Sequence, residues 1–158
     1  INKMLVNFYN RMEDYFAQFT EESQYSLNDA VIIASMIEKE TDGEDYRDIA
    51  SVIYNRLENT AAETAGYLQI DATLVYINGG NVPTDADREI DSPYNTYLYQ
   101  GLPAGPISNP GMESLYAAMN PNDTSYYYYV LNPETGRHDF SRTYAEHQAK
   151  VAQYANNG

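Results

Sequence analysis

The sequence predicts an α+β fold, with helices at both ends of the chain and a small antiparallel sheet near the C-terminus. Two patterns support this prediction. Apolar residues recur at helical spacing over residues 3–59 and again near the end of the chain. A tyrosine-rich run, followed by a turn sequence, is typical of a β-hairpin. With 158 residues, the chain is long enough for one domain with a hydrophobic core.

Three helices are expected in the first part of the chain. Residues 3–19 carry apolar side chains at helical spacing. The second helix begins at Ser26, which can form a capping box with Asp29, and the Asp-Gly sequence at residues 42–43 stops it. A third helix over residues 45–59 has one apolar face. Together these helices supply most of the expected core.

The second part of the chain is less regular. A short strand over residues 68–70 and a short helix over 72–77 are expected first. Residues 92–111 hold four prolines and three glycines, which forbid a long helix or a central strand and favour a fixed wall built from loops. The remaining expected elements are a helix over 111–120, strands over 125–131 and 137–140 joined by a turn at 133–136, and a helix over 142–155.

The composition excludes several classes of protein. The net charge is −14, from 23 acidic and 9 basic residues, and such a surface repels the phosphates of nucleic acids. There are no cysteines, so disulfides and thiol chemistry are excluded. Neither a signal peptide nor an apolar stretch long enough to span a membrane is visible. The chain starts at Ile1 without an initiator methionine, which suggests a fragment of a longer protein.

Tyrosine is unusually abundant. The chain has 17 tyrosines, four phenylalanines and no tryptophan. Tyrosine covers apolar area and keeps a hydrogen-bonding tip, which suits a groove for a polar, ring-shaped ligand such as a sugar. The run Tyr126–Tyr129 is better interpreted as part of a β-strand, because aromatic residues favour strands.

Two carboxylates end the second helix and form the main candidate for chemistry. Glu38 and Glu40 follow an apolar run, at the negative end of the helix dipole. Both conditions disfavour the charged form of a carboxylate and suit a general acid. The helix positions one turn and two turns before Glu38 hold small residues, whereas those before Glu40 hold large apolar ones. A ligand or another element can approach a small face, so Glu38 is the preferred proton donor and Glu40 its support. An ordinary charged helix end is the alternative interpretation.

Other polar residues stand among rigid turns. Gln69 and Asp71 flank one residue, so they point to the same side of an extended segment, and Asp71 can also cap the following helix. Amides and hydroxyls held by turns suit sugar hydroxyls and acetamido groups, and this set is Asn95, Thr96, Tyr97 and Asn109. No metal-binding motif is present, and neither a metal nor a cofactor is expected.

Six blocks, in this order, resemble the MltG/YceG-like endolytic murein transglycosylases. They are ASMIEKET (34–41), IASVIYNRL (49–57), LQIDATLVY (68–76), SPYNTY (92–97), GLPAGPISNPG (101–111) and HDFSRTYAEH (138–147). The resemblance covers about residues 28–152, nearly the whole chain. The family usually has Asp-Pro-Thr where this chain has Asp-Ala-Thr at residues 71–73, and the change removes only a helix-starting proline.

The resemblance implies a lysozyme-like catalytic domain over residues 28–158, preceded by a helix within residues 1–27, in a single domain. The family's catalytic acid/base lies in the EKET block and is assigned here to Glu38, so Glu38→Gln is expected to fold and be inactive. The implied reaction cleaves the β-1,4 bond between N-acetylmuramic acid and N-acetylglucosamine and leaves 1,6-anhydro ends. The implied binding residues are Glu40, Gln69, Asp71, Asn95, Thr96, Tyr97 and Asn109.

The resemblance also implies a setting for the protein. Family members carry a membrane-spanning helix and a small LysM-like domain before the catalytic part. The full-length protein is therefore expected to be anchored in the membrane, with this domain on the outer face of the bacterial cytoplasmic membrane. Its expected partners are peptidoglycan glycan strands and cell-wall synthases.

Two other functions stay open. A hydrolytic, lysozyme-like muramidase would use water and leave reducing ends, which differ from anhydro ends by the mass of one water. A non-catalytic glycan-binding or scaffold module of cell-wall synthesis would bind glycan and release nothing.

Overall fold

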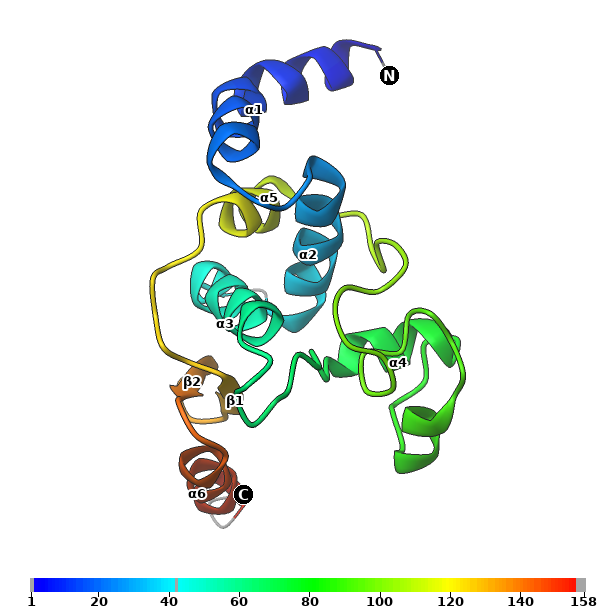
Figure 1. Cartoon of the computed structure of the whole chain (residues 1–158), viewed down its shortest axis with the longest axis vertical. Helices are drawn as coiled ribbons and strands as arrows, with labels where there is room; N and C mark the ends of the chain where they lie inside the picture. Colours follow the sequence, from blue (N-terminus) through cyan, green and yellow to red (C-terminus); the bar gives the residue numbers. More distant parts are fainter. Residues whose placement is uncertain (1, 42, 156–158) are drawn as a thin grey trace.

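The computed structural model describes residues 2–41 and 43–155, with side chains described at residue 10 and from residue 12 onward within these ranges. It confirms the predicted α+β fold (Figure 1). The N-terminal elements are α1 (Asn2–Glu22), α2 (Leu27–Glu40) and α3 (Tyr46–Glu58). They are followed by α4 (Asp71–Ile77), the 3-10 helix η1 (Asp85–Glu89), α5 (Met112–Met119), β1 (Tyr128–Asn132), β2 (Arg137–Ser141) and α6 (Tyr144–Ala155).

Helix α2 forms the centre of the core. Its start is fixed by the predicted capping box, in which Ser26 Oγ accepts the backbone N–H of Asp29 and the Asp29 carboxylate accepts that of Ser26. Every residue from Ile32 to Ile37 is buried, because α2 packs against both α3 and α5. This packing fixes the position of α2, and the residues of its last turn, from Glu38 to Glu40, are partly exposed.

Helix α1 lies at one end of the molecule and α6 at the other (Figure 1). Met12 and Phe19 of α1 are buried in the same core as α2. None of the helices within the described residues is both long and apolar enough to cross a lipid bilayer.

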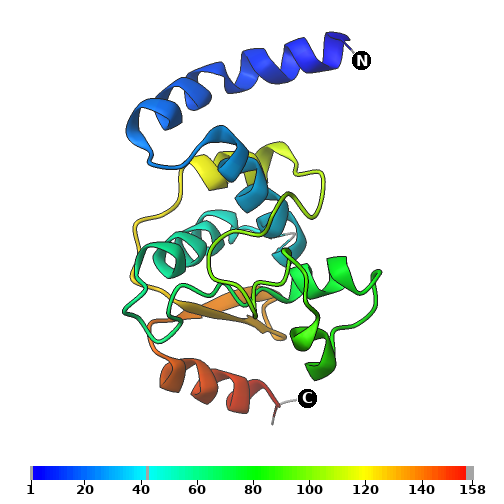
Figure 2. The same ribbon diagram turned by 45° about the vertical axis from the view of Figure 1, so that its right-hand side comes forward.

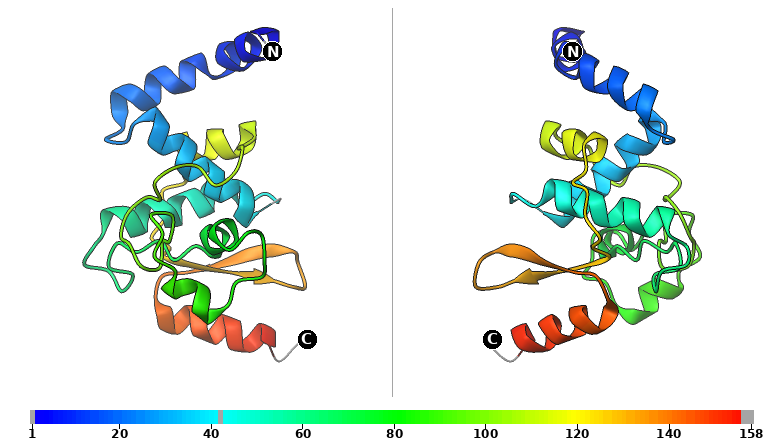
Figure 3. Two further views of the ribbon diagram at one scale, coloured as in Figure 1. Left: turned by 90° about the vertical axis from the view of Figure 1, so that its right-hand side faces the viewer. Right: turned by 60° about the vertical axis from the view of Figure 1, so that its left-hand side comes forward.

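The predicted hairpin lies between the helical core and α6 (Figures 2 and 3). Its strands are antiparallel, with Tyr128 opposite Ser141 and Asn132 opposite Arg137. Gly136 closes the turn, with a φ of 69° and a backbone N–H that donates to Asn132 O at 2.9 Å. Strand β1 contacts both α3 and α6, so its residues lie next to the helical core.

The prediction of a strand over residues 68–70 is wrong. Leu68 and Ile70 are buried, as the alternation suggests, but Gln69 has a φ of 50°. The backbone N–H of Gln69 donates to Thr96 O at 3.1 Å, and that of Ile70 donates to Thr96 Oγ1 at 3.0 Å. Because one residue of the opposing loop takes both bonds, no strand ladder forms.

Other details of the elements also differ from expectation. The first strand begins at Tyr128 instead of residue 125. The 3-10 helix η1 was not expected, although Thr84 and Asp87 form a capping box at its start. The N-cap of α4 is Ile70, and Asp71 is the first residue of that helix, so Asp71 does not cap it as predicted. The expected stop at residue 42 lies outside the described residues, and α2 ends at Glu40.

Candidate active site

The last turn of α2 presents Glu38 and Glu40 to two different parts of the molecule. Both side chains are half-buried. Glu38 faces the start of α5, whereas Glu40 contacts a tyrosine of β1. The helix end is common to both residues, so any difference between them comes from the groups that each side chain meets.

Glu38 clamps α2 to α5. Its Oε2 accepts the backbone N–H of Gly111 at 3.0 Å and the hydroxyl of Ser114 at 2.6 Å. The hydrogen bond from Ser114, followed by that from Gly111, lowers the pKa of Glu38 from its ordinary value. These bonds favour the charged form of Glu38, whereas a general acid needs a raised pKa.

The small face of α2 before Glu38 admits a loop, as its side-chain sizes suggest. Ser35 Oγ accepts the backbone N–H of Ile107 at 3.0 Å, and Ser35 O accepts the hydroxyl of Ser108 at 2.9 Å. These bonds join residues 92–111, the proline-rich wall, to α2. In this structure, the space predicted for a close approach is occupied by the protein itself.

Glu40 has the opposite electrostatic environment. Burial raises its pKa above the ordinary value, and the nearby Asp71 charge raises it further. The hydroxyl of Tyr129 donates to Glu40 Oε2 at 2.7 Å, and this bond, the backbone N–H of Ala72 and His138 act in the lowering direction. Burial is the largest of these effects, so the pKa of Glu40 moves toward the range that a general acid needs.

The hydroxyl of Tyr129 stays protonated and donates a hydrogen bond to Glu40. Burial, and then the charge of Glu40, raises the pKa of Tyr129 well above its usual range. Tyr129 therefore keeps its proton and orients one oxygen of Glu40. Behind it, the ring of His138 meets the Tyr129 ring edge-on, with centroids 5.4 Å apart, and the backbone N–H of His138 donates to the buried Asp45 at 2.8 Å.

A cavity of about 480 Å³ lies beside Glu40. It is formed by the end of α2, the first turns of α4, the segment after α4 and the proline-rich wall. Its lining residues are Lys39, Glu40, Asp71, Ala72, Val75, Tyr76, Gly80, Pro83 and Ile107. The cavity is thus open to a ligand and carries two carboxyl groups, one from each helix.

Asp71 is the second carboxyl group. It is exposed and accepts the hydroxyl of Tyr97 at 2.5 Å. The guanidinium of Arg88 lies over the Tyr97 ring, 5.0 Å from its centroid. Two of the predicted binding residues, Asp71 and Tyr97, are therefore brought together beside Glu40.

The other predicted binding residues lie in two different settings. Asn95 and Thr96 are 1% exposed, and both are engaged by the protein. The Asn95 amide donates to Arg88 O and Ile90 O, at 3.1 and 2.9 Å, while Thr96 Oγ1 accepts the backbone N–H of Ile70. Gln69 and Asn109 are exposed, and their side chains have no hydrogen-bond partner within the described residues.

Sequence reasoning missed Tyr129 as a partner of the site. The signal for it was present, because the run of tyrosines that includes it is unusual, but that run was interpreted as strand residues alone. Alternation along β1 does place Tyr128 and Tyr129 on opposite faces. Nothing in the local sequence says that one of these faces meets Glu40, 89 residues away in the chain.

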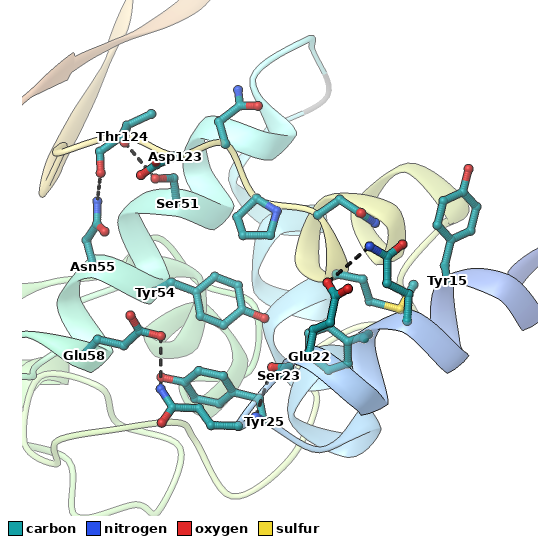
Figure 4. Close-up of a pocket in the computed structure, with 17 residues that line it drawn as sticks. Tyr15, Glu22, Ser23, Tyr25, Ser51, Tyr54, Asn55, Glu58, Asp123 and Thr124 are labelled. Atoms are coloured by element: carbon teal, nitrogen blue, oxygen red, sulfur yellow. Dashed lines mark hydrogen bonds between the residues drawn. The ribbon is translucent and has the colours of Figure 1, made fainter.

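A larger cavity of about 530 Å³ lies elsewhere in the molecule (Figure 4). It is bounded by the end of α1, one face of α3 and residues 119–124. Carboxylates of Glu22, Glu58 and Asp123 line it, together with Tyr25 and Tyr54. None of its lining residues lines the cavity beside Glu40. Within the described residues, no group of three or more His, Asp or Glu side chains is placed to hold a metal ion.

The fold and the site define a class of protein. A small α+β domain that presents two carboxyl groups, in unlike surroundings, to one cavity has the arrangement of a general acid–base catalyst. The chain belongs to the YceG-like family, which residues 1–153 match.

The chain is similar to several known proteins. It is 36% identical over 157 residues to a Bacillus subtilis (strain 168) protein named endolytic murein transglycosylase, covering 98% of this chain and 42% of that one. It is 28% identical over 164 residues to the protein of the same name from Streptococcus pneumoniae serotype 2, covering 99% of this chain and 29% of that one. The chain thus spans less than half the length of these curated relatives.

A solved structure agrees with the fold. The crystal structure of a YceG-like protein from Listeria monocytogenes superposes with a TM-score of 0.76 at 39% sequence identity. The superposition covers 91% of this chain and 45% of that one. The shared architecture therefore extends over most of this chain.

Proposed function

We propose that this domain cleaves the glycan strands of peptidoglycan as an endolytic lytic transglycosylase, with Glu40 as the acid/base. The observation that carries the proposal is the half-buried carboxyl group of Glu40, oriented by Tyr129 in a cavity large enough for a sugar. The name of the relatives, endolytic murein transglycosylase, supports the substrate and the reaction.

The proposal reverses the order of the two glutamates given by the sequence. The sequence favours Glu38 because the side chains that precede it on the same face of α2 are small. Two hydrogen bonds now hold Glu38 in its charged form, and both come from a structural helix. Glu40 meets the two requirements of a proton donor: a raised pKa and access to a cavity.

The proposed reaction uses one carboxyl group twice. Glu40 donates its proton to the glycosidic oxygen between N-acetylmuramic acid and N-acetylglucosamine, and the bond from C1 to that oxygen breaks. The muramic ring passes through an oxocarbenium-like state. The Glu40 carboxylate then takes the proton of the C6 hydroxyl, whose oxygen bonds to C1. A 1,6-anhydro end forms, Glu40 regains its proton and no water is consumed.

The sugars need ligands along the cavity. Asp71, Gln69 and Asn109 are exposed, and we assign to them the hydrogen bonds to sugar hydroxyls and acetamido groups. The ring of Tyr76, which lines the cavity, offers a surface for a sugar face. Asn95 and Thr96 hold the wall and the segment before Asp71 in place, so their contribution is indirect.

The cellular setting belongs to the same proposal. A domain that acts on nascent glycan strands works outside the cytoplasmic membrane, close to the synthases that make those strands. We infer that a membrane anchor in the full-length protein holds it there. The catalytic unit would be residues 28–158, preceded by a helical segment within residues 1–27.

The test is a digestion of purified peptidoglycan in water labelled with oxygen-18, followed by mass spectrometry. A transglycosylase releases anhydro-ended fragments, one water lighter than reducing-ended ones, without the label. A muramidase would put one labelled oxygen on each new reducing end. Binding of glycan without release of fragments would instead favour a scaffold module.

A further inference from the structure

Two phenol–carboxyl pairs flank the cavity. Tyr129 of β1 donates to Glu40 of α2 at 2.7 Å, and Tyr97 of the proline-rich wall donates to Asp71 of α4 at 2.5 Å. Both carboxyl groups line the cavity, so they face the same ligand space. The four side chains come from four separate segments, and each phenol fixes the direction of its own carboxyl group.

The two pairs differ in their access to water. Glu40 is half-buried, whereas Asp71 is exposed. Two negative charges that share a cavity repel each other, so the first proton is retained by the group that water solvates less well. Burial therefore directs the proton to Glu40.

Several cations counter this effect. Lys39 of α2 lines the cavity, His138 of β2 lies behind Tyr129, and the buried Arg56 of α3 also senses the charge of Glu40. Each of them, when charged, favours the carboxylate form of Glu40. The negative charge of Asp71 acts against these three groups and adds to the effect of burial on Glu40.

We propose that Asp71 is a positioning residue whose negative charge, fixed by Tyr97, keeps a proton on Glu40 until the glycosidic oxygen takes it. This inference rests on the proposed function, which makes Glu40 the acid/base. After the proton has left, two carboxylates face each other across the cavity. Their repulsion makes Glu40 a stronger base toward the C6 hydroxyl, which returns a proton to it. Asp71 thereby assists both steps and no net proton is transferred.

The first experiment measures kcat/KM for glycan cleavage against pH in the wild type and in Asp71→Asn. Asparagine keeps the size of the side chain and an oxygen to accept the Tyr97 hydroxyl, but it removes the charge. The alkaline limb, which reports loss of the Glu40 proton, should move to lower pH. Loss of the sugar contact of Asp71 should lower activity by the same factor at every pH, and we expect about a further tenfold loss on the alkaline side only. An equal loss at every pH would contradict the proposal.

Three further variants sharpen this experiment. Tyr129→Phe removes a hydrogen bond that favours the charged form of Glu40, so its alkaline limb should move the other way, to higher pH. Asp71→Glu keeps the charge and should restore most of the wild-type profile. Asp91 is the matched control, because it accepts the Tyr99 hydroxyl at 2.7 Å and does not line the cavity. Asp91→Asn should leave the limb where it is.

A second experiment does not depend on catalysis. The carboxyl carbon of Glu40 is followed by NMR as a function of pH, in the wild type and in Asp71→Asn. The proposal requires a lower titration midpoint in the variant, and an unchanged midpoint would overturn it. A shifted midpoint in a protein that releases no fragments would keep the coupling between Asp71 and Glu40 and reject the proposed function instead.

Discussion

Two glutamates in the last turn of α2 can be compared directly. Glu38 and Glu40 lie two residues apart at the C-terminal end of α2, with the same helix dipole behind them. Glu38 meets a backbone N–H and a hydroxyl at the start of α5, and its pKa falls. Glu40 meets a buried phenol and a second carboxylate, and its pKa rises. The difference shows that partners from distant segments, more than the helix end itself, set the direction in which the pKa of each carboxyl group moves.

The surroundings of the two glutamates also differ: one region joins elements of the fold, and the other is a cavity. The region around Glu38 holds α2, α5 and the proline-rich wall together, with Ser35 as a second point of attachment. The region around Glu40 is a cavity to which α2 and α4 each contribute a carboxyl group. A mutation in the first region should change stability, and one in the second should change activity.

The largest expected effect is that of Glu40→Gln. Glutamine keeps an oxygen for the Tyr129 hydroxyl but has no proton to donate, so cleavage of glycan strands should fall by about 10²–10⁴-fold. The free energy of unfolding at neutral pH should not decrease, because a poorly solvated charge is removed. Fragment release and urea unfolding measure the two quantities, and activity above about one tenth of the wild-type value would contradict the assignment.

The next effect is that of Glu38→Ala. This variant loses two hydrogen bonds to a carboxylate and should lower the free energy of unfolding by about 1–3 kcal/mol, with only a several-fold loss of activity. Ser114→Ala is the matched variant, since it removes the partner with the shortest bond to Glu38. The double variant should be less destabilised than the sum of the two single ones. Strict additivity, measured by urea unfolding, would show that Glu38 and Ser114 do not stabilise the fold through their mutual hydrogen bond.

The two glutamates should also respond to pH with opposite signs. The lowered pKa of Glu38 means that its stabilisation is present above the ordinary value of 4.5 and is lost as pH falls through the folded-state value. The raised pKa of Glu40 means that its favourable contribution is present below 4.5 and is lost as pH rises through the folded-state value.

Unfolding measured from acid to neutral pH tests these signs. Glu38→Gln should be less stable than the wild type at neutral pH and approach it in acid. Glu40→Gln should be at least as stable as the wild type at neutral pH, and any gain should vanish in acid. The same trend for both variants would mean that the two environments are alike.

The smallest effect concerns two residues with positive φ angles. Ala65 and Gln69 have positive φ angles of 49° and 50°, which glycine adopts more easily. Either residue replaced by glycine should change stability by no more than about 1 kcal/mol. Gln69→Gly should also lose glycan affinity, whereas Ala65→Gly should not. Equal affinity in the two variants, measured with a soluble glycan, would remove Gln69 from the proposed binding residues.

Local patterns predicted most of the fold. The capping box of Ser26 and Asp29, the apolar run of α2 and the hairpin turn at Gly136 are all readable in short windows of sequence. The segment around Gln69 was not predictable in this way. Its alternation suggested a strand, but the outcome was decided by Thr96, which lies 26 residues away from Ile70 in the chain.

The site was predicted less completely than the fold. The sequence indicated the end of α2 and named Glu40, Asp71 and Tyr97, which the structure brings close together. It ranked Glu38 above Glu40 because side-chain size along α2 was the available criterion. The deciding partners, Ser114 for Glu38 and Tyr129 for Glu40, are 76 and 89 residues away in the chain. Only the tertiary structure brings them together.

The most direct test compares Glu38→Gln and Glu40→Gln in one digestion of purified peptidoglycan, with anhydro-ended fragments counted by mass spectrometry. We expect that the wild type and Glu38→Gln release such fragments, and that Glu40→Gln releases essentially none. Release by Glu40→Gln, together with an inactive but folded Glu38→Gln, would return the acid/base role to Glu38 and contradict the account.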